Sequence, residues 1–477
     1  MTPARFLLLA AFWLAAPLAQ AGPAAQLGKA CHLPGTEDTL RCLQVAVPRD
    51  YTGAAAGQLQ LHITIAPAYR EASRPDPLFV LAGGPGQAGS DIVSVINSAF
   101  RAVRATRDII LIDQRGTGLS GKLDCPNLPD EDRLSEGAAE AQLMQCVKST
   151  TQSLAPYTTA NAARDIEQVR KALGYGPINL WGGSYGTRLA QAYARAFPSA
   201  VRSLVLDGVA PPEQVIPAGG HDAQAALDKL FAQCAADKEC ARAFPNLKSE
   251  FSALLERAAS GKLQVSLNDP RTAAPLSLNI STRRLIGTVQ NVLYAPLDAR
   301  RLPFLIHSAY QGNWAPFVAR SNAAYDFSTE GGMAGLLHFA IVCSEDLPRL
   351  SPALLAEDSA GSFYTAEAIT RLRPYCAELK LPPPATLASD PIAAPVLMFS
   401  GGLDPVTPPR RAEAAGRHMQ KVQHLIVENA GHGVSNLGCA PRLIREFLDS
   451  PGLIKDPSCL NKIAAQPFQT GSAGPKP

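Results

Sequence analysis

Short apolar segments alternate with longer amphipathic ones in two parts of the chain. Each apolar segment has the length of a buried strand and ends at a turn containing Gly, Pro or Asp. One of them, 178–181, is followed by a helix-like run at 187–197. Buried strands that alternate with helices are typical of a mostly parallel sheet covered on both faces, so the pattern predicts an α/β fold. The expected strands are 77–81, 109–112, 178–181, 204–206, 395–399 and 424–427.

The pattern changes between two proline-rich joints, at 207–220 and 381–395. Strand-like segments stop there, and apolar positions recur at helical spacing in 223–235, 247–259 and 282–294. This change predicts a helical cap inserted into the core. The expected division is a leader at 1–21, a first part of the core at 22–215, a cap at 216–390, a second part of the core at 391–462 and a disordered tail at 463–477.

The most informative motif lies where the strand at 178–181 meets the following helix. It reads Gly182-Gly183-Ser184-Tyr185-Gly186, which is G-x-S-x-G. The outer glycines allow two backbones to approach closely, so Ser184 can stand exposed at the tip of a sharp turn, as a nucleophile requires. Without the flanking strand and helix, the same residues would fit an ordinary glycine-rich turn.

A serine nucleophile needs a base and an orienting acid on later loops. Asp404 follows one expected strand, and His432 lies in a Gly-x-Gly turn after the next. In this order Ser184 would attack, His432 would carry the proton, and Asp404 would orient the imidazole. Asp207, which ends an earlier strand, is an alternative acid, and Asp404 could instead be a loop acid or a helix cap.

Acyl transfer also needs amide donors for the oxyanion. The sequence offers the N–H of Tyr185, next to the nucleophile, and that of Gly84, in the loop after the first expected strand. The same loop matches G-x-G-x-x-G at 84–89, with Asp113 after the next strand, as in a dinucleotide site. Pro85 removes an N–H that a pyrophosphate would need, so the oxyanion role is favoured.

Composition narrows the chemistry further. No Walker-type loop, H-E-x-x-H helix or paired C-x-x-C is present, so the sequence offers no basis for a metal, a nucleotide or another cofactor. The formal charge is +3, or +2 (+3 − 1) once Arg5 leaves with the leader, and there is no polybasic run. This balance argues against nucleic acid and anionic membrane surfaces as partners. With 46% hydrophobic residues, the chain can build a large core and a second domain.

The N-terminal residues 1–21 have the features of a removable signal peptide. Arg5 precedes an apolar stretch at 6–18, and Ala19 and Ala21 supply the small residues of a cleavage site. Cleavage is expected after Ala21, giving a secreted or periplasmic protein with no stable membrane association. A retained anchor is the alternative, although the apolar stretch is short for a membrane span.

Ten cysteines in an exported chain indicate disulfides. Their number allows many connectivities, and the simplest is that neighbours pair, because each successive pair brackets one short segment. The expected bridges are Cys31–Cys42, Cys125–Cys146, Cys234–Cys240, Cys343–Cys376 and Cys439–Cys459. The bridge from Cys439 would tie the loop of His432 to the C-terminal segment.

Taken together, these motifs resemble the α/β-hydrolases grouped with proline iminopeptidases, and especially their secreted tripeptidyl-aminopeptidase-like branch. The resemblance runs from about residue 40 to about residue 445. Ala82 departs from it, since cytosolic relatives usually carry histidine before the paired glycines, and the departure bears on loop support. The matching segments are 83–86, 113–120, 161–165, 182–188, 206–208 and 341–346, with the loops of Asp404 and His432.

The resemblance implies an α/β-hydrolase fold with a mostly parallel central sheet and an inserted helical cap. It also implies acidic cap residues that bind the free ammonium group of a substrate. The matching residue is Glu345, with Asp346 as the alternate, and a helix-capping or surface acid pair is the competing interpretation. Asp113 and Arg115 are expected to brace the loop after their strand through buried pairing.

The sequence therefore predicts a secreted serine exopeptidase that releases one to three residues from the N-termini of peptides through an acyl-enzyme. Two other functions fit the same residues. One is an esterase or amidase that uses the triad on small molecules, and the other is a catalytically silent binding protein with an inherited fold. The residue preference, the number of residues released and the oligomeric state stay open.

Overall fold

The computed structural model of the chain describes residues 27–70, 73–125, 136–270, 272–323, 332–384 and 390–474. The expected leader at 1–21 lies outside these residues. Within them, no helix is both long and apolar enough to cross a membrane.

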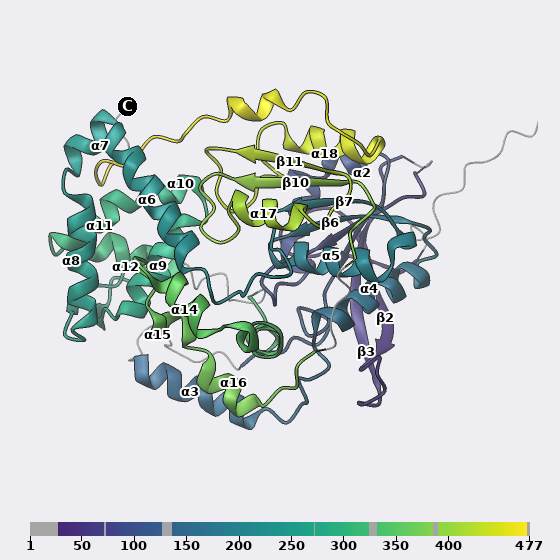
Figure 1. Cartoon of the computed structure of the whole chain (residues 1–477), viewed down its shortest axis with the longest axis horizontal. Coiled ribbons are helices and arrows are strands. Elements are labelled where there is room, and N and C mark those ends of the chain that lie inside the picture. Colours follow the sequence, from purple (N-terminus) through teal and green to yellow (C-terminus); the bar gives the residue numbers. More distant parts are fainter. Residues whose placement is uncertain are drawn as a thin grey trace, which may run out of the picture.

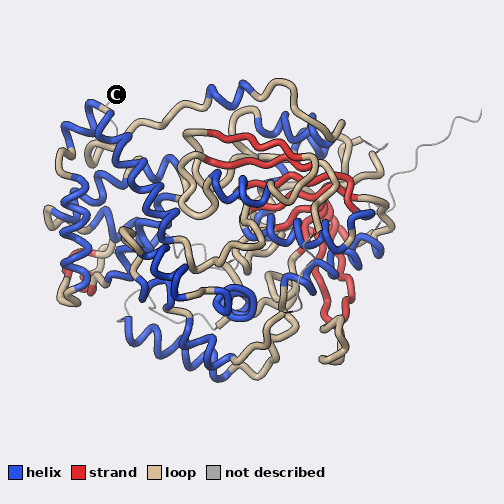
Figure 2. Tube along the Cα trace, in the orientation of Figure 1, coloured by secondary structure: helices blue, strands red, loops and turns tan. Residues whose placement is uncertain are grey.

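A nine-stranded sheet forms the core (Figures 1 and 2). Its strand order is β1-β2-β3-β5-β4-β6-β7-β10-β11. The first three strands pair antiparallel and form one edge, and every pair from β5 to β11 is parallel, which confirms the mostly parallel sheet. The strands are β1 (Lys29–Cys31), β2 (Leu40–Pro48), β3 (Gln58–Ala66), β4 (Leu78–Leu81), β5 (Ile109–Ile112), β6 (Ile178–Gly183), β7 (Val201–Asp207), β10 (Val396–Gly401) and β11 (Val422–Val427).

Alternate residues of the parallel strands face opposite sides of the sheet, and both sides are buried. In β4, Phe79 and Leu81 pack into one hydrophobic cluster, while Leu78 and Val80 pack into another. The first cluster lies under α4 (Thr159–Ala172), α5 (Tyr185–Ala196) and α17 (Pro409–Gly416). The second lies under α1 (Val95–Ser98), α2 (Arg101–Arg104) and α18 (Ala440–Asp449). Continuous burial explains why these strands read as unbroken apolar runs.

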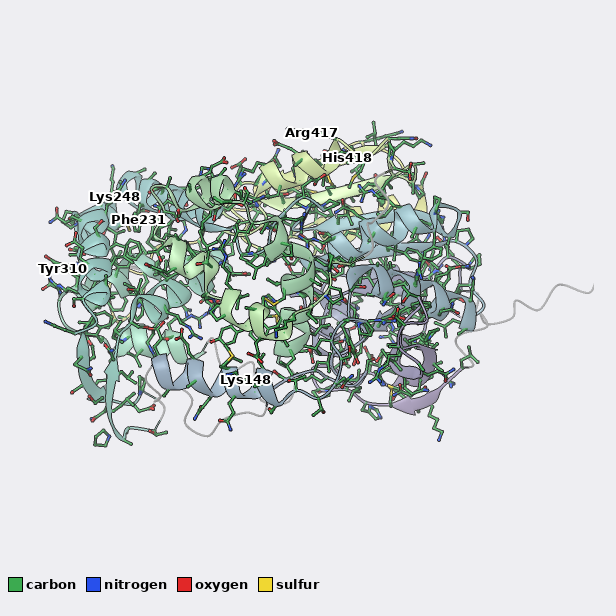
Figure 3. All side chains as sticks on the ribbon, turned by 60° about the horizontal axis from the view of Figure 1, so that its bottom comes forward. Lys148, Phe231, Lys248, Tyr310, Arg417 and His418 are labelled. Atoms are coloured by element: carbon green, nitrogen blue, oxygen red, sulfur yellow. A yellow bond between two sulfur atoms is a disulfide. The ribbon has the colours of Figure 1, made fainter. Side chains whose placement is uncertain are left out.

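The residues between β7 and β10 build a mainly helical cap at one end of the core (Figure 1). Much of the cap has its own hydrophobic cluster, with residues such as Leu230, Leu254 and Phe317 fully or almost fully buried. Phe231, Lys248 and Tyr310 mark this end of the molecule, and Arg417 and His418 mark the core (Figure 3). The cap helices are α6 (Gly220–Ala236), α7 (Lys238–Ala243), α8 (Leu247–Ala259), α9 (Thr282–Leu293), α10 (Pro296–Ala299), α11 (Leu302–Tyr310), α12 (Ala315–Ala323), α13 (Gly335–Ile341), α14 (Pro352–Ser359), α15 (Ala366–Thr370) and α16 (Arg373–Leu379).

Two features differ from the sequence prediction. The cap contains an antiparallel hairpin, β8 (Gln264–Asn268) and β9 (Pro275–Asn279), whose alternating Val and Leu residues carry a strand period that the helical interpretation missed. The tail is ordered as far as residue 474, so the expected disorder is wrong for 463–474. Phe468 is 4% exposed, and the Arg300 guanidinium lies 4.2 Å from its ring centroid, which anchors the tail to the cap.

All five expected disulfides are present, and each joins neighbouring cysteines. Two of them attach helices that pack against each other, α3 (Glu136–Ser149) and α16. Cys125–Cys146 joins α3 to the segment that follows β5, and Cys343–Cys376 joins α16 to the segment after α13. The disulfide framework indicates folding in an oxidising compartment, as expected for an extracellular protein.

Candidate active site

Ser184 occupies the turn between β6 and α5 in a strained conformation. Its φ is +55° and its ψ is −124°, a combination that non-glycine residues rarely adopt. A Cβ on Gly182 would lie 2.4 Å from the Gly186 carbonyl oxygen, and one on Gly186 would lie 2.1 Å from that of Leu81. Glycine is therefore required on both sides of the serine. The turn presents Ser184 at the start of α5, as the motif predicts.

His432 and Asp404 form a hydrogen-bonded pair on the loops after β11 and β10. Asp404 is 1% exposed, and its Oδ2 lies 2.8 Å from His432 Nδ1. The other oxygen accepts from the amides of Val406 (2.8 Å) and Thr407 (2.9 Å). Thr407 Oγ1 also donates to Asp404 Oδ2 (2.7 Å) and lies 3.1 Å from the imidazole Nδ1. The carboxylate is thus fixed from several directions and orients the imidazole.

The cap helps to place His432. The His432 amide donates to the Tyr294 carbonyl oxygen (2.8 Å), just after α9, and the two rings meet edge to face with centroids 5.1 Å apart. A Cβ on Gly431 would lie 2.3 Å from the same carbonyl oxygen, so only glycine allows this approach. Tyr294, at the end of the cap helix α9, therefore helps to set the position of His432, the proposed base.

Burial and charge act in opposite directions on this pair. Burial lowers the pKa of His432, but the charge and hydrogen bond of Asp404, helped by Asp207, outweigh it, so the pKa is raised. Burial likewise raises the pKa of Asp404, but His432 and the amide donors outweigh it, and the pKa is lowered. An ionised Asp404 and a stabilised imidazolium are what proton transfer from a serine needs.

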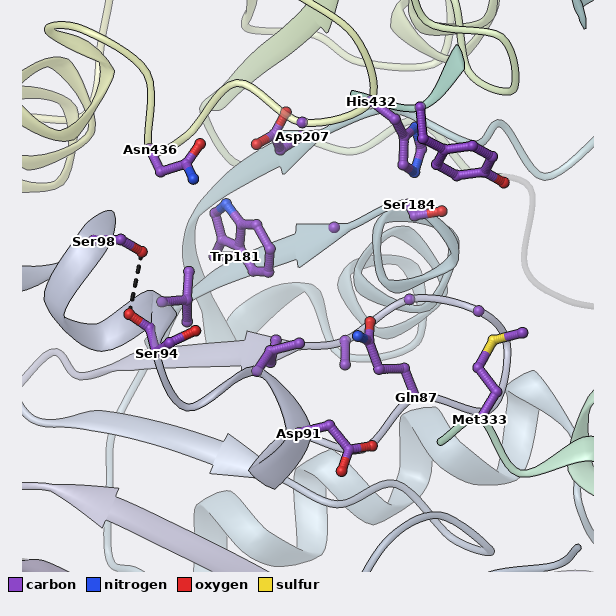
Figure 4. Close-up of a pocket in the computed structure, with 18 of the residues that line it drawn as sticks. Gln87, Asp91, Ser94, Ser98, Trp181, Ser184, Asp207, Met333, His432 and Asn436 are labelled. Atoms are coloured by element: carbon purple, nitrogen blue, oxygen red, sulfur yellow. Dashed lines mark hydrogen bonds between the residues drawn. The ribbon is translucent and has the colours of Figure 1, made fainter. Parts of the chain in front are cut away.

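Ser184 and His432 line one cleft of about 630 Å³ (Figure 4). Figure 4 shows the His432 imidazole beside Ser184, although no hydrogen bond joins them in the part of the chain that the structure describes. The distance between a nucleophile and its base is often long in the absence of substrate. The structure therefore brings Ser184 and His432 to one cleft, with Asp404 hydrogen-bonded to His432.

Asp207, the alternative acid, also lines the cleft but has different partners. It is 4% exposed and accepts hydrogen bonds from the amides of Val434 (2.9 Å) and Ser435 (2.7 Å). Burial raises its pKa, while the Ser435 side chain and these two amides oppose that effect. No hydrogen bond links it to His432 among the described residues. The geometry favours Asp404 as the acid and gives Asp207 the task of holding the loop that follows His432.

The two predicted oxyanion donors come from the residue after the nucleophile and from the loop after β4. A Cβ on Gly83 would lie 2.9 Å from Ser184 Cβ, so the loop after β4 packs directly on the nucleophile. Gly84 has a φ of +106°, and its amide and that of Tyr185 donate no hydrogen bond to another described residue. Gln114 Nε2 donates to the Ala82 carbonyl oxygen (2.9 Å) and thereby supports the loop where histidine was expected.

Asp113 and Arg115 brace their loop, but they do not pair with each other within the described residues. Asp113 accepts from the amide (2.7 Å) and hydroxyl (2.8 Å) of Ser90 and from the Leu119 amide (2.8 Å). Its oxygens are occupied, which leaves no free acid for the ribose of a dinucleotide. Arg115 forms a buried bidentate pair with Asp165 instead, at 2.6 and 2.7 Å.

Glu345 and Asp346 lie away from the cleft lining and have other partners. Glu345 accepts from the amide (2.7 Å) and hydroxyl (2.6 Å) of Thr159. Asp346 is fully buried and pairs with Arg188 (3.1 Å) and Arg349 (2.7 Å). The structure does not bring either carboxylate to the catalytic residues, so ammonium binding by these residues stays a prediction.

Sequence reasoning missed two contributors to the site, Thr407 and Tyr294. Thr407 follows Asp404 by three residues, and at this spacing a hydroxyl can donate a hydrogen bond to a carboxylate within one turn. The spacing was therefore a signal that the sequence contained. Tyr294 ends a cap helix far from the triad motifs, and nothing local marks it. Among the described residues, no group of three or more His, Cys, Asp and Glu is placed to hold a metal ion.

Comparisons with known proteins agree with this geometry. Residues 76–278 match a family model described as "alpha/beta hydrolase fold", and residues 362–459 match one described as "TAP-like protein". The chain therefore matches the α/β-hydrolases over residues 76–278, and its sheet has that fold. Its TAP-like match and its curated relatives make the chain similar to serine peptidases.

Three relatives support the second assignment. The chain is 29% identical to serine protease Hip1 of Mycobacterium tuberculosis over 281 residues (54% of this chain, 53% of the relative). It is 29% identical to tripeptidyl aminopeptidase of Streptomyces coelicolor over 194 residues (37% and 36%), and 33% identical to proline iminopeptidase of Neisseria gonorrhoeae over 145 residues (30% and 36%). The chain thus spans about half or less of the length of these curated relatives.

The activity should depend on the protonation of His432. Only neutral imidazole can accept the Ser184 proton, so kcat/KM should fall as the pH drops through the pKa of His432. Because this pKa is raised, half-maximal activity should lie above pH 6.5. Removing the charge in Asp404→Asn should move that point to lower pH. Rates from about pH 5 to about pH 9 measure both effects, and an unmoved acid limb would contradict them.

Proposed function

We propose that this protein is an exported serine exopeptidase that removes residues from the N-termini of peptides through an acyl-enzyme. Ser184 attacks the scissile carbonyl, His432 takes the hydroxyl proton and returns it to the leaving amine, and Asp404 holds the imidazole. The amides of Gly84 and Tyr185 stabilise the oxyanion. The observation that carries the proposal is the hydrogen-bonded Asp404–His432 pair at the same cleft as the strained Ser184.

The charge of the cleft supports a substrate with a free N-terminus. Among the described residues, its lining includes the carboxylates of Asp91 and Asp207 and no lysine or arginine. Such a lining favours a cationic group over an anionic one. The names of the relatives, a serine protease, a tripeptidyl aminopeptidase and a proline iminopeptidase, support the same class of substrate.

Export rests on two features of the chain. The five disulfides require an oxidising compartment, and residues 1–21 carry the signal-peptide features described above. We therefore propose cleavage after Ala21 and release as a secreted or periplasmic protein. N-terminal sequencing of the exported protein tests the position of cleavage, and a mature chain that still begins at Met1 would contradict it.

Matched chromogenic peptides test the exopeptidase proposal. Tripeptide p-nitroanilides with a free N-terminus should be cleaved about ten- to a hundredfold faster than their N-acetylated forms, because acetylation removes a charge-assisted hydrogen bond of about 1.5–3 kcal/mol. A series of p-nitroanilides in which the acyl part is proline, alanine or a tripeptide would show how many residues are released. Equal rates on free and acetylated peptides would remove ammonium recognition from the account.

A second function, esterase or amidase activity on small molecules, is favoured by one observation. The cap carboxylates expected to bind the ammonium group, Glu345 and Asp346, are occupied by Thr159, Arg188 and Arg349. A protein without an ammonium site would hydrolyse neutral esters and ignore the N-terminus of a peptide. Efficient cleavage of p-nitrophenyl esters, with no cleavage of any peptide anilide, would establish this alternative.

A further inference from the structure

One continuous segment, residues 332–346, contacts the Gly84 loop directly and is linked to Tyr185 through Thr159. It comprises a short loop, α13 and a π-helical turn (Val342–Asp346). At its start, the Ala334 amide donates to the Gly86 carbonyl oxygen (2.9 Å). One turn later, His338 Nδ1 lies 3.3 Å from the Pro85 carbonyl oxygen. The first end of the segment therefore holds the loop that carries Gly84.

The Gly84 loop and the segment pack closely at this end. A Cβ on Gly86 would lie 2.9 Å from the Ala334 carbonyl oxygen, and one on Gly84 would lie 3.2 Å from Met333 Sδ. Both glycines have positive φ angles, +106° at Gly84 and +121° at Gly86, which other residues rarely adopt. The conformation of the loop and the position of the segment are therefore fitted to each other.

The other end of the segment reaches Tyr185 through a buried hydrogen-bond chain. Glu345 accepts the Thr159 hydroxyl (2.6 Å), and Thr159 Oγ1 lies 2.7 Å from the Tyr185 hydroxyl. Because the Thr159 hydroxyl donates its one proton to the Glu345 carboxylate, Thr159 Oγ1 must accept its second hydrogen bond from the Tyr185 hydroxyl. Thr159 is 0% exposed and Tyr185 is 4% exposed, so water does not compete with these bonds.

A second contact holds the same helix one turn further on. Arg188 of α5 is 2% exposed and lies 3.1 and 3.2 Å from the two oxygens of the buried Asp346. The Cys343–Cys376 disulfide joins the π-helical turn, which carries both acidic residues, to α16. π-Helical turns are rare and occur frequently at functional sites. The nucleophile helix is thus tied to the segment by neighbouring residues, Glu345 and Asp346.

We propose that segment 332–346 positions both amide donors of the oxyanion hole, with His338 acting on the Gly84 loop and Glu345 acting on Tyr185. The inference rests on the proposed function, since it needs an oxyanion to be stabilised. Glu345 and His338 are positioning residues, because neither lines the cleft. This gives Glu345 a different task from the ammonium binding that the resemblance implied. Misplacing a reacting group by about 1 Å can lower a rate about a hundredfold.

A mutant cycle along the hydrogen-bond chain tests the inference. Glu345→Gln, Thr159→Val and Tyr185→Phe should each lower kcat about ten- to a hundredfold with KM changed less than about twofold, because only the transition state carries the oxyanion. The double variant Thr159→Val/Tyr185→Phe should be no slower than the worse single variant, because the chain is already cut. Thr159→Ser keeps the hydroxyl and should restore the rate.

A transition-state analogue provides the readout that loss of stability would not move. The inhibition constant of a peptidyl trifluoromethyl ketone, whose adduct carries the oxyanion, should rise by the factor by which kcat/KM falls. Glu378→Gln is the matched control, since Glu378 is exposed on α16, and it should behave like the unaltered protein. If Thr159→Val fails to fold, Tyr185→Phe and Glu345→Gln carry the same test.

Three outcomes would overturn the inference. One is a kcat within twofold of the unaltered protein in Glu345→Gln. Another is multiplying effects of Thr159→Val and Tyr185→Phe. The third is a rise in KM confined to free-amine peptides, which would make Glu345 an ammonium ligand. Ser184→Ala separates these results from the proposed function. If Ser184→Ala is inactive while the Glu345, Thr159 and Tyr185 variants have normal rates, only the positioning role fails. If Ser184→Ala stays fully active, the proposed function fails.

Discussion

Replacing Ser184 by alanine should lower kcat by about 10⁵- to 10⁶-fold and leave the fold intact. The residual rate would come from the oxyanion donors and substrate binding, which act without a nucleophile. The turn should tolerate alanine at position 184, because removing Oγ leaves the backbone of the turn and its glycines unchanged. Hydrolysis of a tripeptide p-nitroanilide by the full chain, with the thermal unfolding midpoint alongside, measures both parts of the expectation.

The matched control for this variant is Ser252→Ala on the exposed face of α8, in the cap. It should keep the rate of the unaltered protein. A Ser184→Ala variant that loses less than about tenfold in kcat would show that another group attacks the substrate or that the activity arises elsewhere.

Replacing Asp404 by asparagine should lower kcat by about 10⁴-fold. Because the amides of Val406 and Thr407 both need an acceptor, the Asn oxygen would stay with them and its NH2 would face His432 Nδ1, so the imidazole loses the acceptor that fixes its tautomer. KM should change little, because Asp404 lies behind the imidazole and is almost fully buried. Steady-state kinetics on the same anilide measure the loss.

Asp207→Asn is the comparison that assigns the acid. Asp207 accepts its hydrogen bonds from Val434 and Ser435 and none from His432 among the described residues, so its loss should lower the free energy of unfolding by about 1–3 kcal/mol and reduce kcat far less than Asp404→Asn does. The opposite ranking, with a folded Asp207→Asn protein losing more activity than Asp404→Asn, would make Asp207 the acid and contradict the account.

The parallel strands of the sheet and the loops that follow them were predictable because their causes are local. A buried parallel strand must be apolar on both faces, so runs such as 109–112 and 178–181 stand out. The serine turn needs glycines at close backbone approaches, and these are visible in the sequence around Ser184. The neighbour pairing of the cysteines was predictable too, because each bridge closes a segment of at most 33 residues.

The parts that were predicted wrongly or missed depend on tertiary contacts. The Gly, Ser and Pro residues of the tail indicate disorder, but one aromatic residue, Phe468, is buried and packs against the Arg300 guanidinium. The positions of Glu345 and Asp346 depend on how the segment after α13 packs against α4 and α5, which no local pattern specifies. Tyr294 contacts His432 only because the end of α9 meets the catalytic loop.

The central claim is that Ser184 is a nucleophile activated by His432. The most direct measurement is labelling of the purified full chain by a fluorophosphonate, followed by intact mass and peptide mapping. The account predicts one adduct per chain on Ser184, and strongly slowed labelling in His432→Ala. A chain that stays unlabelled, or one labelled at the same rate without the imidazole, would contradict it.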